Sequence, residues 1–424
     1  MVANSWAAQN AVPTQTQPPL TLTLQDALSR AHSNSVSFQA ALTDRGLARE
    51  DKKQAAAALL PSVNYNNQFL YTQGNGTATG RFAANNAVHE YISQGNVHEA
   101  IGYSEVSDYR RSRALEAMAR AKAEIAARGL VVTVVQSYYG LLAAQRKYAT
   151  AQQAVAEAEQ FLGLSRKLEN SGEVAHADVI KAQIQHKDRQ RDLLEARLAM
   201  DKARLDLTIL LFPDFNENFT LVDDANLSPP LTSFEDFTKA AQVRNPNLQA
   251  ATAGLQAARF ELASAQGGHL PSLALDYFYG IDSQHFAVHE PNGTRNLGYA
   301  TTVTLNIPIW NWGATHSKAV QAGLKRQQAQ RELSFAQRNL QAQMRELYAE
   351  ADAARTELEL LKSSSELAAE SLRLTTLRYQ GGEATVLEVV DAQNTLTQSR
   401  NAYDDGGVRY RLALATLQNL TGTM

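Results

Sequence analysis

Residues 60–71 read LPSVNYNNQFLY, and residues 270–281 read LPSLALDYFYGI. In both stretches a proline is followed by side chains that alternate between apolar and polar, which is typical of a β-strand with one apolar face. The same offset of 210 (270 minus 60) relates Gly172 to Gly382. Solenoid repeats have periods of roughly 20 to 50 residues, so an offset this long indicates a duplicated domain.

Each of these strands is expected to return as a second strand and so to form a β-hairpin. Residues 299–309 alternate clearly, whereas residues 88–97 are a weaker and more polar counterpart in the first half. The two hairpins are therefore predicted at about residues 61–103 and about residues 271–310. Four strands of roughly ten residues have the length that crosses a bilayer when tilted.

Two long segments without proline are predicted to be helical, from about residue 104 to 168 and from about residue 314 to 378. They are dominated by Ala, Gln, Glu, Arg and Leu, which favour helix. At ~1.5 Å per residue, each helix would be on the order of 100 Å long. Short breaks at about residues 169–174 and 379–384 precede a returning helix, so the chain is expected to contain two long helical hairpins.

The repeats are assigned to residues 20–212 and 233–422, each containing a helix, a β-hairpin and a long helical hairpin. Residues 213–232, which contain several prolines, are interpreted as the linker between them. Residues 1–19 are rich in Gln, Pro and Thr and are interpreted as a disordered leader. This leader is either the remnant of an export signal or a flexible tail.

Composition argues against several classes of function. The net charge of −3 gives no electrostatic case for binding nucleic acid. There is no cysteine, which excludes disulfides, thiol catalysis and cysteine-ligated metals. His285 and His289 share a predicted loop, and their spacing of four residues would give metal geometry only if that loop were helical. No catalytic set is present. Neither enzyme activity nor a metal or other cofactor is therefore expected. Residues 129–144 come nearest to an apolar membrane span but are interrupted by polar side chains, so a transmembrane helix is not expected.

Four strands with an apolar outer face imply a membrane barrel that is shared between copies. A sheet in lipid must close, because no water satisfies the hydrogen bonds of an open edge. Two copies would give eight strands around a filled interior, whereas three would give twelve strands around a lumen. We therefore predict an internally duplicated α+β membrane protein, in which a homotrimer in contact with lipid builds a 12-stranded β-barrel continued by a tube of long helical hairpins.

Three stretches resemble the TolC family of outer membrane efflux proteins. They are residues 379–393, which read YQGGEATVLEVVDAQ, the matching residues 172–183, and residues 306–313, which read NIPIWNWG. The resemblance extends from about residue 20 to 422 and implies a trimeric channel-tunnel in the outer membrane of a Gram-negative bacterium, extending into the periplasm. In this family the periplasmic tips are gated and meet a periplasmic adaptor (membrane fusion) protein and an inner-membrane transporter.

Two positions depart from the family pattern. His98 stands in the first repeat where the second has Pro308, so the boundaries of the first hairpin are less well defined. Ala384 occupies a position where the family can carry an arginine that latches the closed tip. That latch is therefore not expected in this chain.

Acidic residues near the second tip are candidates for the tunnel entrance. Glu388 and Asp391 are three residues apart and share one helical face. By the resemblance they match acidic residues that ring the entrance, and Tyr379 is assigned to the same gate. Three copies of the pair would favour cations. Glu388 has a second interpretation, because Thr385 and Glu388 also have the spacing of a capping box.

In the first repeat the residues corresponding to Glu388 and Asp391 are Asp178 and Lys181, which would make that part of the ring mixed in charge. The tip turns are candidate docking sites for the adaptor, although their glycines are equally well interpreted as left-handed helix caps. The candidate docking residues are Asn170, Ser171, Gly172, Glu173, Gly381, Gly382 and Glu383. Trp310 and Trp312 fit either an aromatic belt at the membrane interface or a buried packing role.

Two further alternatives are open at this stage. The chain could be a soluble long-helix scaffold or adaptor, which would be extracted without detergent and would need no trimer. Within the channel interpretation, small-molecule efflux and type I protein secretion differ only in the partner. The strand pattern favours the channel over the scaffold, because residues 273–281 and 299–309 would otherwise expose two large apolar faces.

Overall fold

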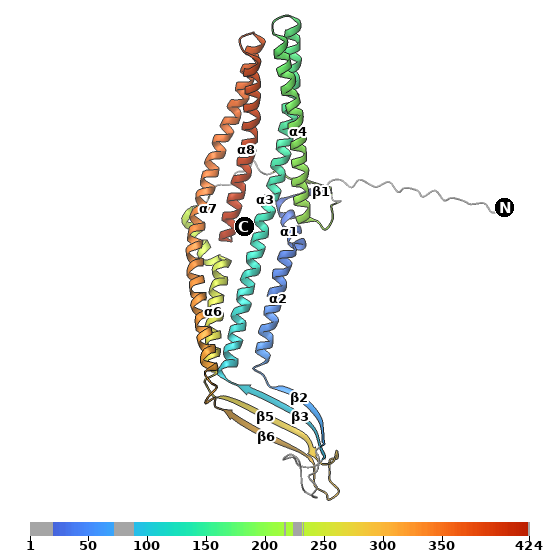
Figure 1. Cartoon of the computed structure of the whole chain (residues 1–424), viewed down its shortest axis with the longest axis vertical. Coiled ribbons are helices and arrows are strands. Elements are labelled where there is room, and N and C mark those ends of the chain that lie inside the picture. The colour runs from blue at the N-terminus through green and yellow to red at the C-terminus, as the bar shows by residue number, and fades with distance from the viewer. Residues whose placement is uncertain (1–19, 72–88, 216–217, 224–230, 232, 423–424) are drawn as a thin grey trace, which may run out of the picture. The chain divides into compact units, whose positions relative to one another are not determined.

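The computed structural model describes residues 20–71, 89–215, 218–223, 231 and 233–422 (Figure 1). The predicted leader, residues 1–19, and part of the predicted linker lie outside the described residues. The described chain divides into two compact units. The sheet unit comprises Ser37–Ala127 and Thr238–Met344, and the tip unit comprises the remainder of the described chain.

The sheet unit contains an antiparallel sheet of four strands in the order β2-β3-β5-β6. The strands are β2 (Ser62–Tyr71), β3 (His89–Ile101), β5 (Ser272–Ser283) and β6 (Leu297–Asn306). The four strands predicted from the alternation are therefore present. β6 ends at Asn306 and not at the predicted Ile309, because Pro308 has no N–H to donate to a strand ladder.

The strand register gives the sheet one apolar and one polar face. Val63 pairs with Val97, Val97 pairs with Tyr277, and Tyr277 pairs with Thr301. Directly paired residues point to the same face, and every second residue joins them. The exposed large apolar side chains on this face are Val63, Tyr65, Phe69, Tyr71, Ile101, Leu273, Leu275, Tyr277, Tyr279, Tyr299, Val303 and Leu305.

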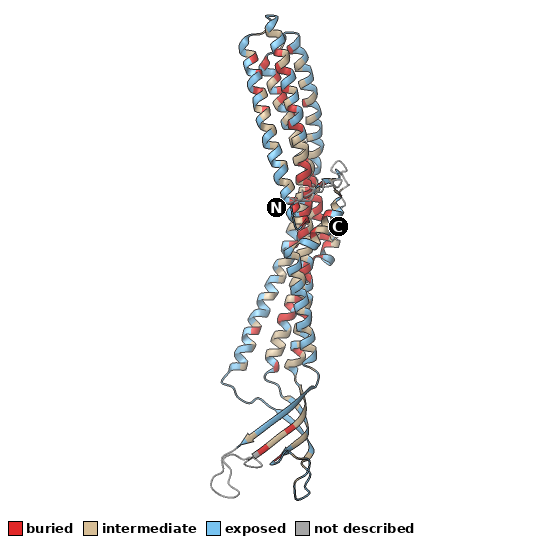
Figure 2. Ribbon diagram, turned by 90° about the vertical axis from the view of Figure 1, so that its right-hand side faces the viewer, coloured by how far each residue is buried: buried red, intermediate tan, exposed pale blue. Residues whose placement is uncertain are grey.

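The opposite face of the sheet is mostly polar. Its side chains are Ser62, Asn64, Asn66, Gln68, Gln94, Asn96, His98, Asp276, Thr302, Thr304 and Asn306, with a minority of apolar residues between them. Figure 2 shows the strands mainly as exposed or intermediate, with few buried residues. The apolar face therefore has no partner within the described chain.

Helices in the sheet unit are joined by ion pairs. They are α2 (Val36–Ala57), α6 (Pro246–Gly267) and the first parts of α3 (Tyr103–Asn170) and α7 (Ala314–Gln380). Lys52 Nζ of α2 lies 2.8 Å from Glu116 Oε2 of α3. Lys325 Nζ of α7 lies 2.6 Å from Glu261 Oε1 of α6. In each repeat, an ion pair therefore joins the shorter helix before the β-hairpin to the long helix after it.

The tip unit contains the remaining parts of α3 and α7 together with α4 (His176–Leu211) and α8 (Val386–Thr421). α3 turns back into α4, and α7 turns back into α8, so the two predicted helical hairpins are present (Figure 1). Buried residues gather between these helices (Figure 2).

A small parallel ladder in the tip unit goes beyond what the sequence pattern predicts. β1 (Leu20–Leu22) pairs with β4 (Phe219–Leu221), which lies inside the predicted linker. The hydroxyl of Tyr138 in α3 lies 2.7 Å from the carbonyl oxygen of Val222 and 3.2 Å from that of Leu22. Tyr138 is 1% exposed, so this ladder is fixed to α3 by a buried hydrogen-bonding group.

The helix predicted at the start of each repeat is divided in two. α1 (Leu24–Asn34) precedes α2, and α5 (Phe234–Arg244) precedes α6. The second break has a clear chemical cause, because the Asn245 side chain accepts a hydrogen bond from Leu248 N at 3.0 Å and Pro246 occupies the first turn of α6. An asparagine cap followed by proline starts a new helix.

Helix α3 contains an 18-residue window that is long and apolar enough to cross a membrane by composition, and 39% of that window is buried. The polar side chains that interrupt residues 129–144 predict no transmembrane helix here. A buried helix in a soluble unit passes the same test of composition. Because this window belongs to a 68-residue helix that packs in the hairpins, it is weak evidence for a helical span.

Gly280 of β5 can be used to test how closely β5 and β3 approach each other in the sheet. A Cβ at this position would lie 2.2 Å from the Ser93 carbonyl oxygen and 2.4 Å from Gln94 Cα, both in the backbone of β3. We expect Gly280→Ala to destabilise the β3–β5 pairing by about 1–3 kcal/mol. The measurement is the temperature at which the detergent-solubilised protein loses its β-sheet signal in circular dichroism.

Gly298 of β6 is the matched control, because it pairs with Gly280 and a Cβ there would meet no atom within 4 Å. Gly298→Ala should change the unfolding temperature little. Equal melting of the two variants would show that the close approach of β3 to Gly280 is not a constraint on the sheet.

Candidate functional site

Both hairpin tips end in the same left-handed turn. Gly172 has φ +78° and Gly382 has φ +74°. At the second tip, Glu383 N donates to the carbonyl oxygen of Arg378 at 2.8 Å, and Gly382 N donates to that of Tyr379 at 3.1 Å. The first tip repeats this pattern around Gly172. These are the paired hydrogen bonds of a Schellman motif, so the interpretation of both glycines as left-handed caps is confirmed.

The predicted docking residues lie on these turns. Asn170, Ser171, Gly172, Glu173, Gly381, Gly382 and Glu383 are all exposed. A side chain at Gly172 or Gly382 would meet no atom within 4 Å, so the turns are open to their surroundings. Their role in docking an adaptor stays a prediction.

Glu388 caps the start of α8. Thr385 N donates to Glu388 Oε1 at 3.0 Å, and Glu388 N donates to Thr385 Oγ1 at 3.3 Å, which is a complete capping box. Arg378 Nη1 lies 3.4 Å from Glu388 Oε2. The hydrogen bonds from Thr385, aided by the charge of Arg378, hold the pKa of Glu388 below its usual range. Its capping role is therefore confirmed, while a second role in an entrance ring stays a prediction.

The other predicted entrance residues differ between the repeats. Lys181 Nζ lies 3.5 Å from Asp178 Oδ1, so these two residues of the first repeat pair with each other. Asp391 of the second repeat is exposed, one helical turn beyond Glu388. Of the predicted entrance residues, the pair at the start of α8 is therefore wholly acidic, whereas the pair at the start of α4 has one acid and one base.

The start of α4 uses a different contact from the start of α8. Ala175 provides no side-chain cap. Instead, His176 Nδ1 lies 2.6 Å from Glu169 Oε1, which joins the two arms of the first hairpin. The duplicated tips therefore share a backbone turn but not the side chains that stabilise it.

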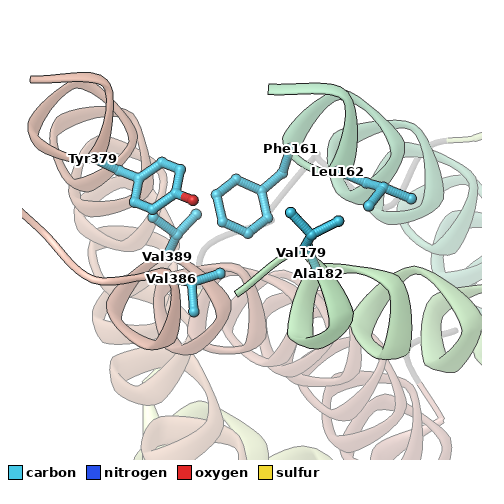
Figure 3. Packing of buried hydrophobic residues seen from close by; sticks show 7 residues of the cluster. All are labelled: Phe161, Leu162, Val179, Ala182, Tyr379, Val386 and Val389. Atoms are coloured by element: carbon cyan, nitrogen blue, oxygen red, sulfur yellow. The ribbon is translucent and has the colours of Figure 1, made fainter. Parts of the chain in front are cut away.

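An apolar cluster joins the two helical hairpins near their tips (Figure 3). Phe161 of α3 and Tyr379 of α7 form its centre, with ring centroids 5.1 Å apart. The cluster consists of Phe161, Leu162, Val179, Ala182, Tyr379, Val386 and Val389. Val386 and Val389 are three residues apart and so lie on one face of α8, which packs in the contact between the hairpins.

Tyr379 is a link between hairpins. Its side chain is 3% exposed, and its hydroxyl donates to Ser165 Oγ at 3.2 Å. Ser165 is 0% exposed, so water cannot replace the tyrosine if the bond breaks. A buried polar group without a partner costs about 1–3 kcal/mol. Sequence reasoning missed Ser165 and Phe161; their spacing of four residues on α3 was the available signal.

Farther from the tips, charged side chains also join the hairpins. Arg400 Nη1 of α8 lies 3.4 Å from Glu157 Oε1 of α3. Arg146 of α3 lies 2.8 Å from Asp223 and 3.5 Å from Asp404 of α8. Burial raises the pKa of Asp404, and the charge of Arg146 partly offsets this effect. The hairpins are therefore held by apolar packing, to which these charged pairs are added farther from the tips.

Trp310 and Trp312 are 74% and 89% exposed. Their rings contact each other edge to face, with centroids 6.0 Å apart. Neither ring is packed within the described chain, which disfavours the buried interpretation. Their position just after β6 is compatible with a membrane-interface belt, which stays a prediction.

Among the described residues, no group of three His, Cys, Asp or Glu side chains is arranged to hold a metal ion. His285 Nδ1 lies 2.9 Å from Glu290 Oε2, within hydrogen-bonding distance in the β5–β6 loop. The backbone of His289 bridges to Arg295. These contacts stabilise the loop without bringing the two histidines into a metal site.

Comparison with known proteins connects this geometry to a family. The family model described as "Outer membrane efflux protein" matches residues 27–211 and 238–423. Its two matches follow the two repeats. The chain is 24% identical over 415 residues to the protease secretion protein PrtF of Dickeya chrysanthemi, covering 95% of this chain and 88% of that protein.

Two further similarities extend this comparison. The chain is 26% identical over 328 residues to the alkaline protease secretion protein AprF of Pseudomonas aeruginosa, covering 74% of this chain and 66% of that protein. Its structure is similar to the crystal structure of the Campylobacter jejuni outer membrane channel CmeC, with a TM-score of 0.82 and 16% identity. That alignment covers 94% of this chain and 85% of the channel, and it shows a common fold.

The capping box predicts that the start of α8 is sensitive to acid. The pKa of Glu388 is lower in the folded chain than in an unfolded one. Its stabilising contribution is therefore fully present above the ordinary pKa of glutamate, roughly 4 to 4.5, and is lost as pH falls through the lowered value. We expect protection of the first turn of α8 against hydrogen exchange to decrease only below this range.

Thr385→Ala should remove the same cap at every pH and accelerate exchange in residues 385–392 roughly fivefold. The first turn of α4, which has no side-chain cap, is the internal control and should be unchanged. Equal acceleration in both turns would mean that the substitution loosens the whole tip and does not act through the cap.

Proposed function

Because the chain belongs to the outer membrane efflux protein family, we propose that three copies of it form a channel-tunnel for exported substrates. The protein is an outer membrane protein of a family of channels, with helices that extend into the periplasm. In the proposed cycle, an inner-membrane transporter and a periplasmic adaptor deliver the substrate to the tips. The channel conducts it outward without a reaction of its own.

The main support for this proposal is that the sheet has two open edges. β2 and β6 are the edge strands, and the apolar face between them is exposed. In hydrocarbon every backbone N–H and C=O must be paired, so neither edge can stay open. Each neighbouring pair in the sheet is antiparallel, so β2 and β6 run in opposite directions. β6 of one copy can therefore pair with β2 of the next and continue the same antiparallel order.

The number of copies follows from the space required inside the barrel. Two copies would give eight strands, whose interior is filled by side chains, whereas three give twelve strands and a lumen. The polar face of the sheet would line that lumen, and the apolar face would contact lipid. A homotrimer is the smallest closed assembly of this sheet that can conduct.

Exposed apolar stripes on the helices also favour neighbouring copies. α7 carries Leu360, Leu367 and Leu374 at intervals of seven residues, and all three are exposed. α4 carries a second set, also exposed: Ile180, Ile184, Leu194, Leu198, Leu205 and Ile209. Spacing by seven suits helices that pack side by side. These stripes would be covered by the helices of adjacent copies in a tube.

The tips are proposed to be the gate. The Tyr379–Ser165 bond and the surrounding apolar cluster hold the second hairpin against the first. Opening the entrance by separating the hairpins would break this bond. Asp391, exposed beside the tip, would contribute one carboxylate per copy to a ring at the entrance and favour cations.

Tyr379→Phe removes the hydroxyl while it keeps the ring against Phe161. Because Ser165 is then left buried without its partner, we expect the closed state to lose about 1 kcal/mol and the open probability in planar bilayers to rise roughly fivefold. Ser165→Ala should have a similar effect.

The double variant separates the bond from general packing. Once both polar groups are gone, no buried group lacks a partner, so its effect should be clearly smaller than the sum of the two single effects. Strictly additive effects would show that the two side chains act independently and that their hydrogen bond does not hold the gate.

Two kinds of cargo are candidates. Small-molecule efflux is the first candidate, and the description of the family as outer membrane efflux proteins supports it. Type I protein secretion is the second candidate, because PrtF and AprF are both named for the secretion of proteases. The similarity to CmeC supports only the fold and does not choose between them.

Deleting the gene in its native host and restoring it on a plasmid distinguishes these cargos. Loss of specific proteins from the culture medium, with unchanged accumulation of dyes and drugs, would establish secretion. Increased accumulation of dyes with an unchanged secreted proteome would establish efflux. If deletion changed neither, and the purified protein formed no channel in bilayers, the proposed function would be wrong.

A further inference from the structure

We propose that His98 and Asp276 form a proton-sensitive selectivity ring inside the barrel, separate from the acidic residues at the tips. This inference rests on the proposed trimeric channel and names the side chains that set ion preference in its membrane-spanning part. The ligands are the permeating ions and charged solutes themselves. Acidification is expected to weaken the preference of the barrel for cations.

The two side chains form a direct pair across neighbouring strands. His98 of β3 is the register partner of Asp276 in β5. His98 Nδ1 lies 2.7 Å from Asp276 Oδ1. A carboxylate only accepts hydrogen bonds, so Nδ1 carries the hydrogen and Nε2 is the nitrogen that takes up a proton on acidification. The side chains of His98 and Asp276 are 44% and 21% exposed, so solvent reaches the pair.

The register places this pair on the polar face of the sheet. His98 also pairs with Ser62 of β2, and the next polar-face residue of β3 is Asn96. Val97 and Tyr277, the neighbours of the pair in sequence, lie on the apolar face. If the apolar face contacts lipid, His98 and Asp276 must line the lumen. They lie close to the end of β3 that leads into α3, which is the periplasmic mouth of the barrel.

No basic side chain balances Asp276 on the strands. β2, β3, β5 and β6 contain neither Lys nor Arg. β2 presents no charged residue to the pair at all. On the polar face the other acids are Glu90 and Asp282, toward the opposite end of the strands, while Glu99 is on the apolar face. Among the residues of the four strands, the charge at this level of the polar face is therefore set by His98 and Asp276.

Protonation changes the charge of this ring in a defined direction. With a neutral imidazole each pair carries −1, and three copies attract cations. With an imidazolium each pair is neutral, so the attraction is lost. Histidine is the side chain that ordinarily changes charge between about pH 5 and 8, whereas carboxylates titrate near pH 4. A change of selectivity in this interval therefore reports on histidine and not on the acidic residues.

The test measures the reversal potential of the purified full-length protein in planar bilayers under a gradient of KCl, at about pH 8 and about pH 5. We expect the ratio of potassium to chloride permeability to fall at least roughly twofold on acidification. A single charge about 10 Å from a permeating ion in a water-like medium changes the local concentration of that ion by about this factor. His98→Gln keeps a hydrogen-bond donor beside Asp276 but cannot take up a proton. Its ratio should stay at the pH 8 value at both pH values.

Two further variants keep the test decisive. Asp276→Asn should lower the ratio at pH 8 and, with a charged His98, favour chloride at pH 5. Asp391→Ala, at the tip, should lower the ratio equally at both pH values and leave its pH dependence intact. If His98→Gln does not insert, the inverted preference of Asp276→Asn still tests the proposal.

The outcomes separate this inference from the function on which it rests. Channels whose selectivity depends equally on pH in the wild type and in His98→Gln, or does not depend on pH, would overturn the selectivity ring and leave the channel intact. Absence of any channel activity in the wild type would instead overturn the proposed function.

Discussion

The structure depends on the need to pair every backbone hydrogen-bonding group in a hydrocarbon environment. A four-stranded sheet with an apolar face and two open edges cannot satisfy that need within one chain. The edges run in opposite directions, so identical copies can close them in a continuous antiparallel barrel. The duplication places two hairpins of strands and two hairpins of helices in each chain, so that a barrel and a helical tube can be built from the same three copies.

The two repeats diverge at their tips, where the gate is proposed. Their tips share one left-handed glycine turn, which is held by hydrogen bonds between backbone atoms. The second tip adds a capped helix start with an exposed acid nearby, whereas the first adds a contact between His176 and Glu169 and an ion pair between Lys181 and Asp178. Between them, a buried tyrosine–serine bond sits in an apolar cluster. The contact between the hairpins at the tips is therefore compact and apolar around one buried hydrogen bond.

Much of the fold could be read from the sequence because its signals are local and periodic. The alternation after Pro61 and Pro271, the long tracts without proline and the glycines at 172 and 382 each fix a backbone conformation. The β1–β4 ladder could not be predicted, since three-residue strands have no period and pair across about 200 residues of chain. Nor could Ser165, because a single small hydroxyl becomes important only when packing buries it beside Tyr379.

The mass of the particle extracted from outer membranes in detergent, measured by native mass spectrometry, tests the central claim most directly. Closure of the open sheet edges by identical copies predicts a particle of three 46.4 kDa chains that dissociates directly to unfolded monomers. A stable monomer or dimer, or a protein recovered in buffer without detergent, would contradict the shared barrel. The alternating segments would then form an ordinary β-domain on a helical scaffold.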